Sequence, residues 1–232
     1  MISWLAGDDP FPPVSRALAE PNGLLAAGGD LTLPRLLEAY ALGIFPWYQK
    51  SEPILWWSPD PRMVLFPNEL KVSRSLAKTL RKKQFDVRMD TAFPDVIAEC
   101  AKSRGNGERG TWITPAMKKA YIDLFRAGFA HSIETYCDGE LAGGLYGVSL
   151  GRVFFGESMF YRRRDASKIA LVYCMRQLQR WNFGVLDCQM ESGHLVSMGA
   201  RLIPRREFAR LLEELVHYPA PSVWAFDDEL LK

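Results

Sequence analysis

The sequence predicts an α+β protein built around a mixed, mostly antiparallel sheet. The clearest sign is a change to strand periodicity after residue 131, where three short apolar segments occupy 132–137, 141–148 and 152–160. The pair Asp138-Gly139 between the first two is a strong hairpin signal, so these segments predict an antiparallel meander. A long helical stretch, one further strand, a short helix and a last strand follow, as expected where helices cover a sheet.

Composition sets the class of protein. The chain has 232 residues, of which 48% are hydrophobic and 24% charged, enough for one large or two unequal domains. The net charge of +2 gives no argument for nucleic-acid binding, so only a local basic patch would support it. No apolar run is long enough to span a membrane, and the first residues lack the pattern of a signal peptide. We therefore expect a cytoplasmic protein with no membrane association.

The spacing of cysteine and histidine gives no sign of a metal site. The four cysteines form no C-x-x-C pair, and the three histidines show no H-x-x-x-H spacing. Thiols in a reducing compartment are therefore the expected state. We expect neither a metal nor another cofactor.

The first sixty residues differ in character from the rest of the chain. Turn-forming Pro and Gly residues are frequent in the first thirty. Thr32 is then placed to cap a helix that Gly43 ends. An aromatic-rich stretch follows, and Ser58-Pro59-Asp60-Pro61-Arg62 has the composition of a linker. We therefore expect a small N-terminal domain at 1–62 and a larger domain at 63–232.

The larger domain is expected to begin with elements of both kinds. Strands are expected at 63–66 and 87–89, and helices at 71–83, 93–101 and 115–125. The Gly-rich, charged segment 102–110 is expected to be a mobile loop, but it lacks the G-x-x-x-x-G-K-[ST] spacing that binds phosphate. After the meander, Asp165 or Ser167 is placed to cap a long helix that reaches Trp181.

The expected helix at 71–83 carries positive charge on one side only. At about 100° per residue, Val72, Leu76 and Leu80 share a face, and the opposite face is basic. The basic side chains of this stretch are Lys71, Arg74, Lys78, Arg81, Lys82 and Lys83. No acidic residue lies within 71–85, whereas solvated helix faces usually mix both signs. A polyanion such as RNA is therefore favoured over an ordinary solvated face.

The strand after the long helix contains two polar side chains. Residues 185–190 read Val-Leu-Asp-Cys-Gln-Met, in which Asp187 and Gln189 alternate with apolar neighbours and so share one face. Burying a carboxylate is costly, so its presence in such a strand suggests a site that needs it. The strand is broken just beyond, at Ser192-Gly193, where a site is able to open.

The order meander, helix, strand, short helix and strand is also that of the acyl-CoA N-acyltransferase core. In those enzymes a Gly-rich loop before the long helix holds pyrophosphate through its backbone N–H groups. The corresponding segment here, 161–168, contains no glycine. The acyltransferase skeleton is therefore expected, but a CoA site is not.

Seven motifs, in order over nearly the whole chain, resemble those of the bacterial leucyl/phenylalanyl-tRNA–protein transferases. They are Glu20-Pro21-Asn22-Gly23-Leu24-Leu25, Gly43-Ile44-Phe45-Pro46-Trp47, Trp56-Trp57-Ser58-Pro59-Asp60-Pro61-Arg62, Gly110-Thr111-Trp112-Ile113, Phe155-Gly156-Glu157-Ser158-Met159-Phe160, Asp165-Ala166-Ser167-Lys168 and Leu186-Asp187-Cys188-Gln189. Each motif alone is weak, but all of them in register are highly specific. The resemblance implies a small N-terminal domain, a larger acyltransferase-like domain and no use of CoA.

The resemblance also implies an activity and its partners. Members of the family move leucine or phenylalanine, with methionine as a further candidate donor, from aminoacyl-tRNA to the N-terminal Arg or Lys of a protein. The product carries a degradation signal of the N-degron (N-end rule) pathway. Since the donor ester is already activated and the nucleophile is an amine, the reaction needs positioning, proton removal and oxyanion stabilisation but no cofactor. The sequence shows no dimerisation stripe, so we expect a monomer.

By resemblance, the site residues fall into three groups. Asp187 and Gln189 form the catalytic pair. The residues implied in binding the aminoacyl group and the terminal adenosine are Trp47, Trp112, Leu145, Phe154, Gly156, Glu157, Met159 and Ser167. Those implied in tRNA binding are Arg74, Lys78, Arg81, Lys82 and Lys83. Met159 is a flexible lining residue suited to both Leu and Phe, whereas β-branched donors are expected to be poor.

Two roles stay open for Asp187. In the first it orients or deprotonates the incoming amine, directly or through Gln189. In the second it is structural, capping the next turn or pairing with an arginine. An aspartate of ordinary pKa is a poor base toward an ammonium group, which keeps the second role open.

Two other functions remain as alternatives. One is a CoA-dependent N-acyltransferase, against which the missing Gly-rich loop argues. The other is a non-catalytic RNA-binding protein, which would not need a polar pair in a buried strand. Transfer of a labelled amino acid from charged tRNA to a peptide distinguishes both from the aminoacyltransferase.

Overall fold

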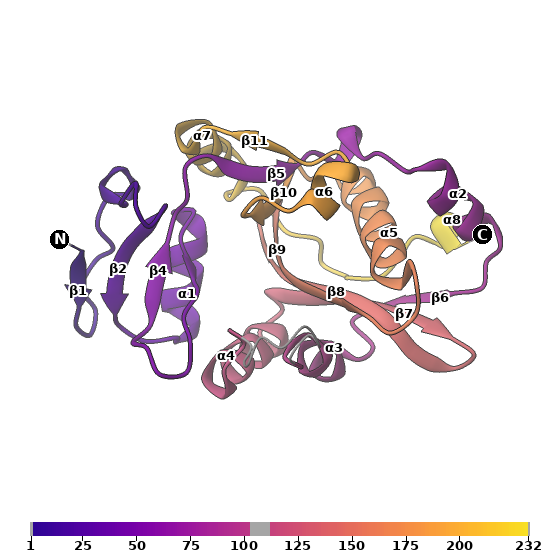
Figure 1. Cartoon of the computed structure of the whole chain (residues 1–232), viewed down its shortest axis with the longest axis horizontal. Coiled ribbons are helices and arrows are strands. Elements are labelled where there is room, and N and C mark those ends of the chain that lie inside the picture. The colour runs from indigo at the N-terminus through magenta and orange to yellow at the C-terminus, as the bar shows by residue number, and fades with distance from the viewer. Residues whose placement is uncertain (1, 103–111, 232) are drawn as a thin grey trace.

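The computed structural model describes residues 2–102 and 112–231 and divides its strands between two sheets (Figure 1). The expected loop at 102–110 and the Gly110-Thr111 pair lie outside the described residues from residue 103 on. The smaller sheet has the order β1-β2-β4-β3. Its strands are β1 Ser3–Leu5, β2 Leu24–Gly28, β3 Phe45–Pro46 and β4 Leu55–Trp57, accompanied by the 3-10 helix η1 Val14–Arg16 and the helix α1 Leu33–Ala41.

The larger sheet has the order β11-β5-β10-β9-β8-β7-β6. Its strands are β5 Arg62–Leu65, β6 Asp86–Met89, β7 Ala130–Cys137, β8 Glu140–Leu150, β9 Val153–Tyr161, β10 Val185–Gln189 and β11 Arg201–Ile203. The pair β9–β10 is parallel, and the other neighbouring pairs formed by these described strands are antiparallel. The predicted α+β fold with a mixed, mostly antiparallel sheet is therefore confirmed.

Helices cover both faces of the larger sheet (Figure 1). The helix α5 Ala166–Arg180 lies on one face beside α2 Arg74–Arg81, and α3 Phe93–Cys100 and α4 Pro115–Arg126 lie on the other. Alternation along β9 separates two apolar clusters, because Phe155 faces the cluster shared with the smaller sheet and Phe154 faces the cluster beneath α5. The remaining helical segments are η2 Pro67–Glu69, α6 Gly193–Ser197, α7 Arg205–Leu215 and α8 Asp228–Leu231.

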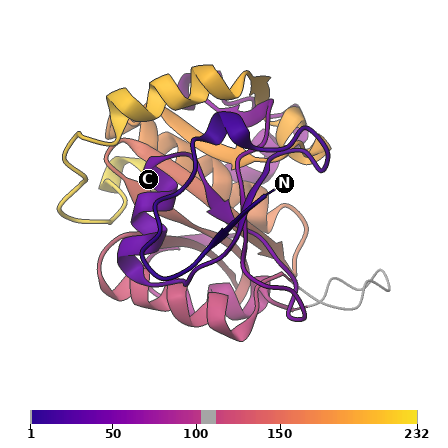
Figure 2. The same cartoon turned by 90° about the vertical axis from the view of Figure 1, so that its left-hand side faces the viewer.

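The N-terminal part lies against one end of the larger sheet. Figure 2 shows it in front of that sheet, with α7 above and α4 below. A Cβ at Gly43, just after α1, would lie 3.1 Å from Leu212 and 3.3 Å from Phe208, both of α7. The glycine also has a φ of 73°, so it both ends α1 and lets α7 pack close. The N-terminal part is therefore packed firmly enough to supply side chains to a site in the larger sheet.

Three local expectations differ from the structure. The basic helix is shorter than 71–83, because Ser73 caps it by accepting the Leu76 N–H and the chain turns to a φ of 48° at Lys83. The Thr32 side chain donates to Asp30 and does not cap α1. Arg62, expected in a linker, is the first residue of β5 and is buried inside the larger sheet.

The C-terminal tail is ordered on the α5 face of the sheet, although its sequence gave no signal. Trp224 stacks on His131 of β7 with ring centroids 3.6 Å apart, and it meets Trp181 edge-on at 4.9 Å. Asp227 forms an ion pair with Arg180 of α5. The tail therefore closes one side of the apolar cluster beneath α5.

Candidate active site

The parallel pair β9–β10 brings two predicted site residues to one place. Asp187 lies opposite Phe155 in the β9–β10 ladder, and the register of β10 against β5 shifts between Asp187 and Gln189. Gln189 has a φ of 64°. A non-glycine residue in the left-handed region costs about 1 kcal/mol or more and persists only where its surroundings hold it there. The alternation predicted for this strand is therefore interrupted at Gln189, which is a strained and partly exposed residue.

Asp187 is fully buried and forms an ion pair with Arg62. The Arg62 Nε donates to Oδ1 at 2.8 Å and Nη2 donates to Oδ2 at 2.7 Å, so the pair is bidentate. The Arg62 Nη1 donates to the Gly43 carbonyl at 3.1 Å, and the guanidinium lies 4.9 Å and 4.8 Å from the rings of Phe45 and Phe208. Every polar group of the pair is therefore satisfied inside the protein. This pairing is one of the two roles that the sequence left open.

Gln189 is held from both ends. Its backbone N–H donates to Asp187 Oδ1 at 2.9 Å, and its side-chain Nε2 donates to Glu157 Oε1 at 2.9 Å. An ionised carboxylate only accepts hydrogen bonds, so Glu157 fixes the amide with its NH₂ group inward. The amide oxygen is then directed away from Glu157 and is available to accept a hydrogen bond from a substrate.

Glu157 of β9 is 9% exposed and accepts hydrogen bonds from two buried tyrosines as well. Tyr40 of α1 donates to Oε1 at 2.7 Å, and Tyr121 of α4 donates to Oε2 at 2.8 Å. Burial raises the pKa of Glu157 to about 7, and the negative charge of Asp187 acts in the same direction. The hydrogen bonds from the two tyrosines and Gln189 lower it, so the carboxyl titrates near neutral pH.

Replacing Glu157 by glutamine is expected to stabilise the fold relative to wild type above neutral pH. The folded-state pKa of about 7 lies above the ordinary value of 4.5, so the unfolded wild-type chain ionises first as the pH rises. Wild type then loses on the order of 3 kcal/mol between these two pH values, at about 1.36 kcal/mol per pH unit, whereas Glu157→Gln does not. Urea unfolding of both proteins across this range measures the difference. Parallel stability curves would contradict the burial assigned to this carboxyl.

Three residues predicted to bind the aminoacyl group form one apolar surface on the α5 side of the sheet. Leu145 and Phe154 are buried in the cluster beneath α5, and Met159 is partly buried against it. Leu145 and Met159 are direct partners in the β8–β9 ladder. Glu157 lies on the other side of β9, toward α1 and α4. The structure therefore sets the apolar and the polar predicted residues on opposite sides of the same strand.

The other residues predicted for this group are spread around the end of β9. Trp47 is 40% exposed and meets Trp57 edge-on at 5.5 Å, and Trp112 is partly buried just before α4. Ser167 is buried in the first turn of α5. A Cβ at Gly156 would lie 3.4 Å from the Asp187 carbonyl, which is ordinary contact. Trp47 is therefore the aromatic surface of this set that is most open to a ligand.

The basic residues predicted to bind tRNA are exposed on and just after α2. Arg74, Lys78 and Arg81 belong to the helix, and Lys82 and Lys83 follow it. The Thr79 hydroxyl donates to Asp165 at 3.3 Å, so α2 lies beside the start of α5. These charges therefore face solvent on the same side of the sheet as the predicted aminoacyl surface.

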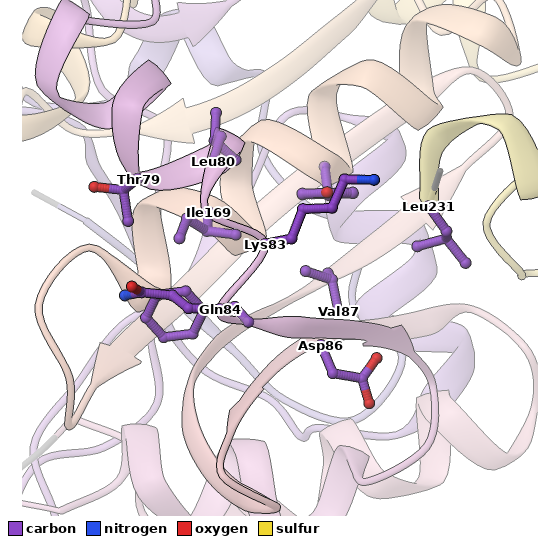
Figure 3. Close-up of a pocket in the computed structure, with 10 residues that line it drawn as sticks. Thr79, Leu80, Lys83, Gln84, Asp86, Val87, Ile169 and Leu231 are labelled. Atoms are coloured by element: carbon purple, nitrogen blue, oxygen red, sulfur yellow. The ribbon is translucent and has the colours of Figure 1, made fainter.

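A cavity of about 270 Å³ lies between the end of α2, β6 and α5 (Figure 3). Its lining includes Leu80, Lys83, Val87 and Ile169, with Leu231 of α8 at its edge. The residues that line it are distinct from the predicted catalytic pair. We therefore assign the reaction centre to β9 and β10 and not to this cavity.

Sequence reasoning missed three members of the polar network. Arg62 was assigned to a linker, and Tyr40 was assigned to the apolar stripe of its helix. Tyr121 lies in an expected helix with no feature that separates it from a core residue. Each contacts a partner more than 30 positions away, so no local pattern identifies it.

The described residues offer no other reactive centre of the usual kinds. Within 2–102 and 112–231, no group of three or more His, Cys, Asp or Glu side chains is placed to hold a metal ion. Over the same ranges, no helix is long and apolar enough to cross a membrane. Burial raises the pKa of the Cys188 thiol beside Asp187, so this cysteine is not poised as a nucleophile.

Comparison with known proteins gives matches over nearly the whole chain. A family model described as leucyl/phenylalanyl-tRNA protein transferase matches residues 64–213, and the model of that protein's N-terminal domain matches residues 29–60. The leucyl/phenylalanyl-tRNA–protein transferase of Chromobacterium violaceum is 60% identical over 227 residues, 97% of each chain. That of Nitrosospira multiformis is 60% identical over 230 residues, 99% of each chain. That of Pseudomonas putida is 55% identical over 97% of this chain and 99% of its own.

Solved structures with a similar arrangement are distant. L-PGS from Bacillus licheniformis has a TM-score of 0.40 and 10% identity over 73% of this chain and 54% of that chain. A GCN5-related N-acetyltransferase from Kribbella flavida has a TM-score of 0.37 and 11% identity over 72% of this chain and 59% of that chain. Scores this low carry no argument about the site.

Proposed function

Because the chain belongs to the leucyl/phenylalanyl-tRNA–protein transferases, a family of aminoacyltransferases, we propose that it moves leucine or phenylalanine from aminoacyl-tRNA to the N-terminal Arg or Lys of a protein. The product is a new peptide bond and an N-degron. The observation that carries the proposal is the Gln189 amide, held by Glu157 through its nitrogen with its oxygen directed outward. The proposal includes a monomer in the cytoplasm, as expected from the sequence.

In this proposal Asp187 acts through Gln189 and does not touch the substrate. It is fully buried, both its oxygens accept from Arg62, and Oδ1 also accepts the Gln189 N–H. These contacts hold the strained backbone of Gln189 and so fix the direction of its side chain. The Gln189 oxygen then accepts a hydrogen bond from the ammonium of the acceptor and orients its nitrogen toward the ester.

The donor is positioned by the two sides of β9. We propose that the leucyl or phenylalanyl side chain enters the apolar surface of Leu145, Phe154 and Met159, while Trp47 stacks on the terminal adenine. Proximity of an activated ester and an amine supplies roughly 7–11 kcal/mol of barrier lowering in well-oriented cases. The protein therefore needs little beyond positioning and one proton acceptor.

Replacing Arg74, Lys78 and Arg81 together by alanine is expected to raise KM for aminoacyl-tRNA and to flatten its dependence on salt. Each lost phosphate contact lowers the slope of log K against log salt by about 0.7 to 0.9. Removing three exposed charges from α4, at Lys118, Lys119 and Arg126, is the matched control and should leave KM unchanged. An unchanged salt slope in the α2 variant would contradict the tRNA-binding role.

The experiment that tests the proposed function is transfer of a labelled amino acid from charged tRNA to a short peptide. Leu-tRNA and Phe-tRNA should label peptides that begin with Arg or Lys. Val-tRNA and Ile-tRNA should be poor donors, because β-branched side chains fit a flat apolar slot badly. Peptides that begin with Ala or Glu should stay unlabelled. Absence of transfer to the Arg peptide from either Leu-tRNA or Phe-tRNA would overturn the proposal.

A further inference from the structure

The Glu157 carboxyl and the hydroxyls of Tyr40 and Tyr121 form a closed ring of three oxygen-to-oxygen contacts. Tyr40 lies 2.7 Å from Oε1, Tyr121 lies 2.8 Å from Oε2, and the two hydroxyl oxygens lie 2.6 Å apart. Both tyrosines are fully buried. The ring members come from α1, α4 and β9, so the N-terminal part of the chain supplies one of them.

Three such contacts need three hydrogens to be complete. With Glu157 ionised, the two hydroxyl protons go to its carboxylate oxygens, and no hydrogen lies between the tyrosine oxygens. One added proton completes the ring, because Glu157 then donates to Tyr40, Tyr40 to Tyr121, and Tyr121 to Oε2. The Gln189 amide continues to donate to Oε1 in both states. The ring is therefore built to take up one proton and to give it back.

We propose that Glu157 is the proton acceptor of the transfer reaction and that Tyr40 and Tyr121 are positioning residues that stabilise it with and without the proton. This inference rests on the proposed function. Gln189 connects the ring to the substrate, since its amide nitrogen is bound to Glu157 and its oxygen faces the incoming ammonium. The proton reaches the carboxylate directly or through one water molecule.

The step balances without any further reactant. One N–H bond of the ammonium breaks, and an O–H bond forms on Glu157. The lone pair that this frees on the nitrogen attacks the ester carbon. When the C–O bond to the ribose then breaks, the leaving oxygen takes a second proton from the same nitrogen. The amide keeps the third hydrogen, and Glu157 returns its proton to solvent as the one proton that the reaction releases.

The surroundings of Glu157 suit this role. The titratable groups that face it are Tyr40 from α1, Tyr121 from α4, Tyr146 from β8 and Asp187 from β10. Asp187 is neutralised by Arg62 of β5. A carboxyl that titrates near neutral pH is both ionised often enough and basic enough to accept a proton from an ammonium group.

The test is the pH dependence of the transfer rate in a single turnover, with Phe-tRNA and a peptide that begins with Arg. Tyr40→Phe and Tyr121→Phe each remove one donor to the carboxylate, so the acid limb of the profile should move to higher pH by roughly one pH unit. The double variant should move it further. The titration of the acceptor amine is common to all the proteins and cancels in the comparison.

Tyr146→Phe is the matched control. The Tyr146 hydroxyl is buried beside Tyr121 but has no hydrogen-bond partner among the described residues, so its removal should leave the profile unchanged. Glu157→Gln, which keeps the shape but takes up no proton, should slow transfer at least about 100-fold at every pH. Thermal unfolding of each variant identifies any that fail to fold.

Three results would overturn the inference while the proposed function stands: wild type transfers but both tyrosine variants keep its acid limb, the limb moves to lower pH, or Glu157→Gln transfers at the wild-type rate. If wild type itself transfers nothing, the proposed function has failed instead.

Discussion

Replacing Arg62 by alanine is expected to lower the free energy of unfolding by about 3–5 kcal/mol, because it leaves the Asp187 carboxylate buried without its partner. Asp187 is fully buried, and Arg62 is its bidentate partner. Transfer should be lost as well, since an unanchored Asp187 no longer holds the backbone of Gln189. Urea unfolding and the transfer assay measure the two effects.

Two controls separate the buried pair from ion pairs in general. Arg201→Ala removes the bidentate but exposed pair with Glu69 and should cost at most about 1 kcal/mol. The double variant Arg62→Met with Asp187→Leu should recover much of the stability, because neither charge is then left alone. It should not recover transfer. A double variant as unstable as Arg62→Ala would show that the unpaired charge is not the cause.

Replacing Gln189 should separate activity from stability. At a φ of 64°, glycine relieves about 1 kcal/mol of backbone strain that alanine does not, so Gln189→Gly should be more stable than Gln189→Ala. Both should lose at least about 100-fold in transfer rate, because neither has the amide. Unfolding curves and single-turnover rates of the two variants give the comparison. Near-normal transfer by Gln189→Gly would mean that the backbone bulge matters and the side chain does not.

The features that the sequence predicted correctly are those encoded over short distances. The meander follows from period-two apolar segments around Asp138-Gly139, and it is present as β7, β8 and β9. The long helix after it is present as α5, and β10 and β11 follow in the expected order. The assignment of Asp187 and Gln189 to one short strand also holds, because a carboxylate in an apolar run stands out against its neighbours.

The features that the sequence did not predict depend on distant partners. Arg62 and Asp187 are far apart in the chain, and nothing near Arg62 indicates that a buried carboxylate awaits it. Tyr40 has the same spacing as the leucines of its helix, so its hydroxyl contact with Glu157 is invisible in the pattern. The number of polar groups around Glu157 was therefore underestimated.

Local backbone departures were also beyond the pattern. The alternation rule assumes a regular strand, but the register shift and the left-handed Gln189 break it at the functional end of β10. The ordered tail is a similar case, because Trp224 acquires its place only when β7 and α5 provide an aromatic surface. Strain and tertiary contacts decided these positions, and propensity did not.

The central claim is that the end of β10, with Gln189 bound to Glu157, is where the amine meets the ester. It is tested most directly by the rate constant of peptide-bond formation in one turnover, starting from Phe-tRNA already bound to wild type or to Gln189→Ala. The account predicts equal affinity for Phe-tRNA and a rate constant at least about 100-fold lower in the variant. Equal affinity with equal rate constants would contradict it and would place the reaction centre elsewhere.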